Sequence, residues 1–189
     1  NWDKTDNWKD GSGTAHIPAE GDTCDLNGKT ITMNLAVIPV SGSLALLTDS
    51  TEGGGYLAAH IVNGQTKTIN ADLIQYGAGS GGTEAVVRAD GNDFGTGTLI
   101  INGNIVGGGY QTSGVTIDGD ITMSVFVNGN VSGGLTPSEL LSFGIISYLG
   151  GTGTIFVSGD VSGGVADYNN GIWLSIGGYL HVEGDLISG

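Results

Sequence analysis

The sequence predicts an all-β, single-domain parallel β-solenoid: a right-handed parallel β-helix of about six or seven coils with an N-terminal Trp-containing cap. Three observations lead to this prediction. Glycine makes up 37 of 189 residues while hydrophobic residues still make up 39%. A short motif recurs along the chain, and apolar residues alternate with polar ones inside it. The length corresponds to about one domain.

The composition indicates a folded chain that turns often. Many short Val, Ile and Leu runs separated by glycines are typical of strands joined by turns. The apolar content is too high for a disordered glycine linker. The single cysteine, Cys24, has no partner for an internal disulfide and is predicted to be a small buried residue.

The repeated motif reads apolar–x–apolar–x–Gly–(Asn or Asp)–apolar. Relative to the glycine, apolar residues stand at positions −4, −2 and +2. A weaker copy at 68–75 has Ala71 in place of the glycine. The motif occurs in the segments 98–108, 114–122, 124–134, 154–164 and 179–189.

Asn-Gly between apolar runs often forms a two-residue β-hairpin, but the parity of the motif argues against one here. In such a hairpin Ile101 and Asn104 would share a face, and every copy would mix an apolar with a polar residue in this way. In one extended strand, positions −4, −2, 0 and +2 all point inward. We therefore predict parallel strands that stack on copies of themselves and bend at each glycine. The Asn and Asp residues that follow the glycines would then be aligned as a ladder on the surface.

The motif glycines give the length of each coil. Ala71, Gly103, Gly129, Gly159 and Gly184 are 32, 26, 30 and 25 residues apart. Varying coil lengths favour a right-handed β-helix over a strict hexapeptide left-handed one. Further strands are predicted between these markers, so each coil holds at least two, and 135–143 is predicted to be an insertion. The additional strand candidates are 84–91, 115–122, 143–151 and 171–178.

The repeats resemble the β-helical part of bacterial autotransporter passengers, large adhesins and phage fibre proteins, whose coils often read T-L-x-I-x-G-x-I. The opening segment resembles that of many secreted β-helix proteins. This resemblance implies that residues 1–34 form a capping segment with the first strand and that 35–189 form the coils. Trp2 and Trp8 would then cover the first coil; ordinary core aromatics are the alternative. The residues that carry the opening pattern are Trp2, Asn7, Trp8, Pro18, Gly21, Asp22, Asn27 and Gly28.

The last copy of the motif is followed by no predicted cap, so its backbone groups are a template for further strands. We expect either a longer solenoid or head-to-tail stacking of copies, which is open-ended. The assembly ends would be Trp2 and Trp8 on one side and Leu180, Val182 and Leu186 on the other. The leading functional prediction is a non-enzymatic structural subunit of a filament, sheath or surface layer.

Charge and composition limit the kinds of partner that the protein can bind and indicate where it is located. There are 19 acidic and five basic residues, and no Lys or Arg follows Arg88. Such a chain repels phosphate backbones, which argues against nucleic-acid binding. No apolar run reaches the ~20 residues needed to span a bilayer. The low Lys and high Gly, Thr, Ser and Asn contents favour an extracellular or cell-surface protein.

The alternatives to a structural role are glycan binding and catalysis. Phe126, Phe156, Trp173 and Tyr179 are candidates for an aromatic surface that binds glycans or another subunit. A glycan-binding adhesin or phage-fibre segment is therefore the second hypothesis.

A carbohydrate-active enzyme, pectate-lyase-like or a glycosidase, is the third hypothesis. Glycoside hydrolysis needs two carboxyls flanking the sugar, which Asp118 with Asp120 or Asp160 with Asp185 would supply. Other copies have Asn at this corner position, so a turn role is favoured and no catalytic residue is assigned. No cofactor is expected apart from a structural Ca²⁺ near Asp160 and Asp185 as an option. His181 is predicted to be exposed, and it is far in sequence from His16 and His60.

Overall fold

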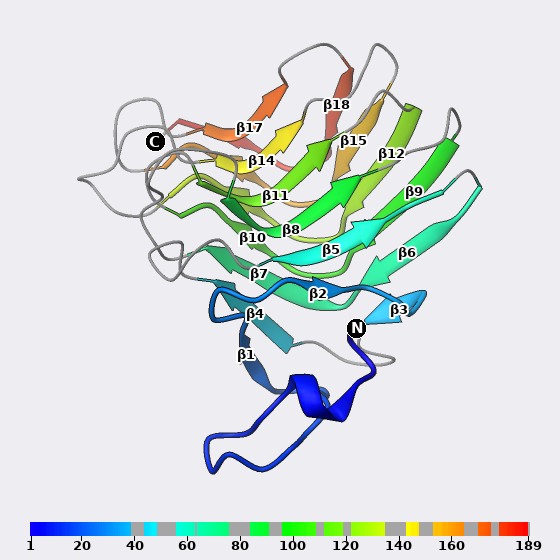
Figure 1. The fold of residues 1–189 in the computed structure, drawn as a ribbon. Coiled ribbons are helices and arrows are strands. Elements are labelled where there is room, and N and C mark those ends of the chain that lie inside the picture. The colour runs from blue at the N-terminus through cyan, green and yellow to red at the C-terminus, as the bar shows by residue number, and fades with distance from the viewer. Residues whose placement is uncertain are drawn as a thin grey trace.

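The protein folds as a parallel β-solenoid, seen from the side in Figure 1. Apart from a short 3-10 turn, η1 (Thr5–Asn7), the described residues contain only strands and their connections. The predicted all-β solenoid class is therefore confirmed. The computed structural model describes residues 1–38, 44–48, 56–62, 64–75, 84–90, 96–108, 112–118, 122–134, 143–147, 153–164, 170–174 and 178–188.

Three parallel sheets form the sides of the solenoid, and the chain visits them in turn. The first sheet contains β1 (Thr23–Asp25), β4 (Leu44–Thr48), β7 (Ala71–Gln75), β10 (Ile105–Val106), β13 (Val131–Ser132), β16 (Val161–Ser162) and β19 (Leu186–Ile187). The second contains β2 (Ile31–Thr32), β5 (Leu57–His60), β8 (Glu84–Asp90), β11 (Thr112–Asp118), β14 (Phe143–Ser147) and β17 (Asn170–Leu174). The third contains β3 (Val37–Ile38), β6 (Thr66–Ile69), β9 (Thr96–Ile101), β12 (Thr122–Val127), β15 (Thr154–Val157) and β18 (Tyr179–Val182).

The repeated motif runs from the third sheet into the first. Positions −4 and −2 lie in the third sheet, as Leu99 and Ile101 do in β9, and position +2 lies in the first, as Ile105 does in β10. All three side chains are fully buried. Equivalent residues stack coil on coil in parallel register, for example Leu99 beside Val125. The parallel, inward-facing prediction is therefore confirmed and the hairpin alternative is rejected.

The sequence predicted that each motif is one continuous strand, and this prediction is wrong. The chain turns a corner at the glycine, so the residues before and after it belong to different sheets. The segments predicted between the markers form the second sheet as β8, β11, β14 and β17. The copy at 114–122 contributes to that sheet, so it is not equivalent to the other four, and its Gly119 lies outside the described residues. The predicted insertion also lies outside them, except for Phe143 in β14.

The corner glycines are required by the close stacking of the coils. A Cβ on Gly103 would overlap the carbonyl oxygen of Ala71, and one on Gly129 would overlap that of Gly103. A Cβ on Gly159 would lie 2.7 Å from the Gly129 carbonyl oxygen. Parallel strands stack about 4.8 Å apart, which leaves no room for a side chain pointing along the axis. Glycine at the corner therefore lets successive coils touch through their backbones.

The two ends of the solenoid differ. In the last coil, Leu180 is 38% and Leu186 is 72% exposed, whereas Ile155 and Val161, their equivalents one coil below, are buried. At the other end lies the N-terminal segment with η1 (Figure 1). The described part of the chain has no helix that is long and apolar enough to cross a membrane.

Trp2 and Trp8 are buried among the side chains of the core at the N-terminal end. Their rings meet edge to face with centroids 4.8 Å apart. The indole Nε1 of Trp8 donates to the carbonyl oxygen of Trp2 at 2.9 Å. The backbone N–H of Trp2 donates to the carbonyl oxygen of Thr32 in β2 at 3.0 Å. The N-terminal segment is thus hydrogen-bonded to the backbone of the first coil at Thr32.

Candidate functional site

The Asn and Asp residues that follow the corner glycines form a ladder along one corner. The backbone N–H of Asn130 donates to Oδ1 of Asn104 at 3.0 Å, and that of Asp160 donates to Oδ1 of Asn130 at 2.8 Å. Asp72 and Asp185 extend the ladder at its two ends by the same bond. The bond needs only an oxygen on the side chain, so Asn and Asp serve equally. The predicted surface ladder is therefore present, and it stabilises the corner.

A second ladder runs beside the first, one residue before the glycine. The Nδ2 of Asn102 donates to Oδ1 of Asn70, and the Nδ2 of Asn128 donates to Oδ1 of Asn102, both at 2.6 Å. Each amide thus links two coils. In the sequence Asn102 and Asn128 each precede a glycine and Asn70 precedes Ala71, but the stacking of the three becomes visible only once the coils are aligned.

The carboxylates considered for catalysis or calcium binding lie in these corners. Asp160 and Asp185 are neighbours on successive coils, and Oδ1 of Asp160 accepts the backbone N–H of Asp185 at 2.9 Å. Asp120 and the side chain of Asp118 lie outside the described residues. Among the residues that are described, no three His, Cys, Asp or Glu side chains are grouped so that they could hold a metal. The geometry at Asp160 and Asp185 is that of a corner hydrogen bond.

Two of the four predicted surface aromatics meet on the outer face of the third sheet. The rings of Phe126 and Phe156 stack nearly parallel, with centroids 4.7 Å apart and 3° between their planes. The ring of His181 follows at 5.8 Å from Phe156. Beside them is a small groove of about 140 Å³, which Asn128, Ser158 and Glu183 also line. The stacked rings cover each other's faces, so their edges are what they offer to a ligand.

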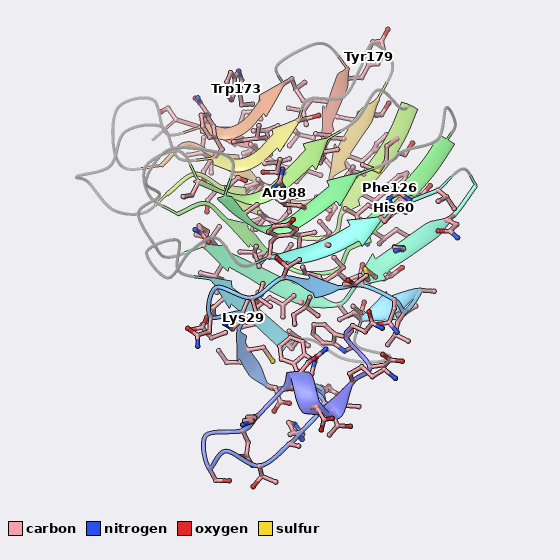
Figure 2. All side chains as sticks on the ribbon, in the orientation of Figure 1. Lys29, His60, Arg88, Phe126, Trp173 and Tyr179 are labelled. Carbon is pink, nitrogen blue, oxygen red and sulfur yellow. The ribbon has the colours of Figure 1, made fainter. Side chains whose placement is uncertain are left out.

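The other two aromatics lie elsewhere on the last coil. Trp173 is on the second sheet, 43% exposed, and its ring stacks on that of Phe143 at 5.1 Å. Tyr179 begins β18 on the third sheet and is 67% exposed. Figure 2 shows both at the same end of the solenoid, away from Lys29. The four residues therefore form no single surface.

A cleft of about 790 Å³ lies between the N-terminal segment and the first coil. Charged and amide side chains, among them Asp10, Asp25, Asn27 and Lys29, line it around Trp8. Cys24 also lines it, and burial followed by the charge of Asp22 raises the pKa of its thiol to about 11. The thiol is therefore protonated and unreactive at neutral pH, in agreement with its predicted structural role.

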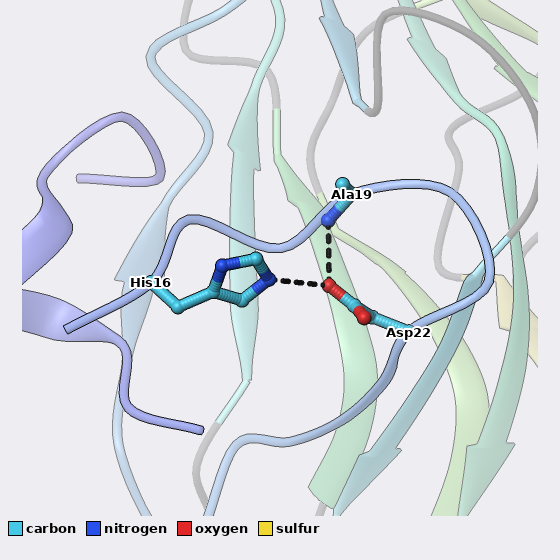
Figure 3. A network of polar contacts seen from close by, with 3 residues as sticks. All are labelled: His16, Ala19 and Asp22. Atoms are coloured by element: carbon cyan, nitrogen blue, oxygen red, sulfur yellow. Dashed lines mark hydrogen bonds and ion pairs between the residues drawn. The ribbon is translucent and has the colours of Figure 1, made fainter. Parts of the chain in front are cut away.

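His16 and Asp22 close the loop beside this cleft (Figure 3). The Nε2 of His16 lies 2.8 Å from Oδ2 of Asp22, which also accepts the backbone N–H of Ala19 at 2.8 Å. The Ala19 N–H, followed by His16, lowers the pKa of Asp22 below its ordinary value. Sequence reasoning missed this pair, because it depends on the path of a loop without a repeat.

His60 and Arg88 both lie in strands of the second sheet. His60 lies in β5 and is half-buried. Arg88 lies in β8, with its guanidinium 5.0 Å from the centre of the Tyr56 ring, a cation–π distance.

Together these features define a three-sided parallel β-solenoid with hydrogen-bonded amide and carboxylate ladders at one corner and exposed apolar side chains on its last coil. Comparison adds no relative: no protein-family model, curated protein or solved structure matches the chain.

Proposed function

We propose that the chain is a non-enzymatic, extracellular structural subunit that associates end to end with other copies, in a filament, sheath or surface layer. The proposal includes a right-handed winding of six or seven coils with Trp2 and Trp8 as the cap of the first. The seven-stranded first sheet supports that coil count, and the burial of both indoles supports the cap. The exposed last coil is the observation that carries the proposal.

The last coil is both apolar and able to pair. Leu186 and Ile187 are 72% and 49% exposed, although Val161, which pairs with Leu186 from the coil below, is buried. Among the described strands, β17, β18 and β19 are each paired on one side only. Exposed edges of this kind are templates for further strands. A second copy would cover the apolar side chains, and burial of such area is the main driving force of association.

Contact between unlike ends would make the association open-ended. The last coil of one copy would lie against the N-terminal end of the next, so each copy would use two different surfaces. The backbone of the first coil is not entirely free at the N-terminal end, because the carbonyl oxygen of Thr32 already accepts the backbone N–H of Trp2. We therefore expect side-chain packing as well as strand pairing at this interface.

The test is a charge placed on the exposed coil. Leu186→Lys should abolish association, because lysine on an edge strand opposes pairing and is costly to bury. Thr66→Lys is the matched control: it adds the same charge at an exposed position of β6, far from the last coil. Sedimentation velocity over a wide concentration range and electron microscopy would report assembly. A wild-type protein that stays monomeric, with no fibres, would overturn the proposal.

The non-enzymatic part of the proposal is supported by what the candidate carboxylates do. Asp160 accepts a hydrogen bond from the next coil, as Asn130 does at the same position one coil below. An exchange of Asn and Asp between copies fits a corner role and not a shared catalytic one. The low Lys and high Gly, Thr, Ser and Asn contents support an extracellular location.

Glycan binding is the second candidate, and the groove on the third sheet favours it. Phe126 and Phe156 supply apolar ring edges, while His181 and Glu183 supply polar groups beside them. A glycan array would test this, with Phe156→Ala as the variant. Binding that survives this substitution would place the glycan site elsewhere.

A further inference from the structure

The Asn27–Gly28 pair forms an isolated turn on the surface of the first coil. Both residues have a positive φ, 44° and 69°, and the backbone N–H of Lys29 donates to the carbonyl oxygen of Leu26 at 2.8 Å. This is a type I′ turn, which favours Asn followed by Gly. The Asn27 backbone N–H donates to Asp25, but within the described residues its side-chain amide and the Gly28 N–H have no partner.

Two other Asn-Gly pairs, which share the same two residue types, are held differently. The Asn102 amide donates to Asn70 and accepts from Asn128, and the Asn128 amide donates to Asn102. The following glycines, Gly103 and Gly129, are stacked on the backbone of the coil below. Asn170–Gly171 lies inside β17, and Asn63 lies outside the described residues. The structure therefore separates one loose Asn-Gly pair from two that are restrained.

We propose that Asn27 is a site of spontaneous deamidation and that the amide ladder protects Asn102 and Asn128. The deprotonated backbone nitrogen of Gly28 attacks Cγ of Asn27, the Cγ–Nδ2 bond breaks, and ammonia leaves with the proton. The five-membered cyclic imide then takes up one water and opens at either carbonyl, giving aspartate or isoaspartate. Water is the only co-reactant, and no oxidant or reductant is needed. Glycine leaves the attacking nitrogen unhindered because it has no Cβ.

The ladder opposes this reaction in two ways. An attacked Asn side chain has to rotate toward the next nitrogen, which breaks its bonds to the neighbouring coils. The backbone must also bend for ring closure, but at the corner it is fixed by the contact of each glycine with the backbone of the coil below. We therefore expect Asn27 to convert at least about fivefold faster than Asn102 or Asn128, the factor that corresponds to the loss of about one hydrogen bond.

The product would change the N-terminal cleft. Asn27 and Lys29 both line it, together with Asp10 and Asp25. Conversion of Asn27 adds a carboxylate to this group of charges. An isoaspartate also adds one backbone atom to the turn between β1 and β2. The inference is independent of end-to-end assembly, because the turn belongs to a single chain.

Peptide mapping by mass spectrometry tests the proposal on the full chain aged in mildly alkaline buffer. Enzymatic methylation of isoaspartate would identify the isomer. We expect conversion at Asn27 while Asn102 and Asn128 remain amides. In urea, where the ladder is absent, all three should convert at similar rates. Equal rates in the folded protein, or an intact Asn27 beside converted ladder residues, would overturn the proposal.

A variant of the ladder separates protection by hydrogen bonds from local sequence effects. Asn70→Ala removes the oxygen that accepts the Asn102 amide N–H and puts no other acceptor in its place. Conversion at Asn102 should rise in this variant while that at Asn27 stays unchanged. Circular dichroism would confirm that the variant is folded. An unchanged rate at Asn102 would mean that its side-chain bond gives no protection.

Discussion

At the scale of single residues, one corner combines two different requirements. The glycine has to lack a side chain, because the backbone of the coil below occupies the space of a Cβ. The next residue has to offer an oxygen to the coil above, which Asn130 and Asp160 both do. The first requirement explains why glycine recurs at this position. The second explains why Asn and Asp exchange freely there.

Replacing a corner glycine by alanine should be destabilising. In Gly129→Ala the new methyl group would overlap the carbonyl oxygen of Gly103, a backbone atom that cannot move away alone. We expect a loss of about 1–3 kcal/mol in the free energy of unfolding, as for overpacked cores. Gly11→Ala is the control, since no atom lies within 4 Å of its added Cβ. Urea denaturation would compare the two, and equal stabilities would contradict the stacked corner.

The His16–Asp22 pair gives a pH-dependent prediction. Folding lowers the pKa of Asp22 below 3.8, first through the Ala19 N–H and then through His16. The carboxylate therefore contributes stability above that ordinary value, and the contribution is lost as the pH falls through the lowered pKa. In His16→Ala the pKa of Asp22 should rise only part of the way, because the Ala19 N–H remains.

An NMR titration of the side-chain carboxyls would measure this change. Asp10 is the internal control: its pKa is lowered mainly by the Ser12 hydroxyl and the Thr14 N–H, and His16 is its smallest cause. Its titration should hardly move in His16→Ala. A pKa of Asp22 at or above the ordinary value in the unmodified protein would contradict the pair.

At the scale of elements, the sequence predicted the longer strands well and the shortest ones poorly. The period of two in 98–101 gives the inward face of β9 directly. The sequence also predicts four strands of the second sheet, β8, β11, β14 and β17, but it does not predict β5. The repeat predicts that two-residue strands of the first sheet, such as β10, continue the preceding strand, whereas they belong to a different sheet. Position +2 points inward whether the chain runs straight or turns at the glycine, so periodicity does not distinguish the two.

The candidate sites were predictable only where they follow the repeat. The corner ladder follows it, and its alignment was predicted. The aromatic residues do not follow the repeat, and Trp173 and Phe156 lie on different sheets. Their separation was not predictable, because the sequence does not show which sheet each strand joins. The N-terminal cleft depends on a loop that occurs once, so nothing in the sequence pattern indicates it.

The N-terminal element gives a prediction about the two tryptophans at opposite ends. Trp2→Ala should cost about 3–5 kcal/mol, the range for a buried indole, because Trp2 is 2% exposed in the core. Trp173→Ala should cost much less, since Trp173 is 43% exposed. Thermal unfolding followed by circular dichroism would measure both. A larger loss for Trp173 would indicate that the last coil is covered in solution.

At the scale of the whole molecule, the described strands pair with those of the adjacent coils, so the stability of the solenoid should vary along its axis. In repeat architectures each unit is stabilised by its neighbours, and the units at the ends have one neighbour fewer. The middle strands β9 and β12 lie between others on both sides, whereas β18 and β19 are at the edge of their sheets.

Hydrogen exchange should therefore be graded along the chain. Amides of β18 and β19 should exchange earliest and those of β9 and β12 latest, because local opening needs less free energy where one neighbour is missing. Exchange read out by mass spectrometry at several protein concentrations would measure this. Uniform protection in a monomer would contradict the gradient. Protection of β19 that grows with concentration would instead indicate association through the last coil.

The corner glycines also explain how coils of different length coexist in one solenoid. Successive corners are 32, 26, 30 and 25 residues apart, yet each returns to the same contact with the coil below. The axial rise is thus set at the corner and not by the number of residues in between. A foreign peptide grafted into a segment that connects two strands of one coil should therefore be displayed on the side of the solenoid without altering its pitch.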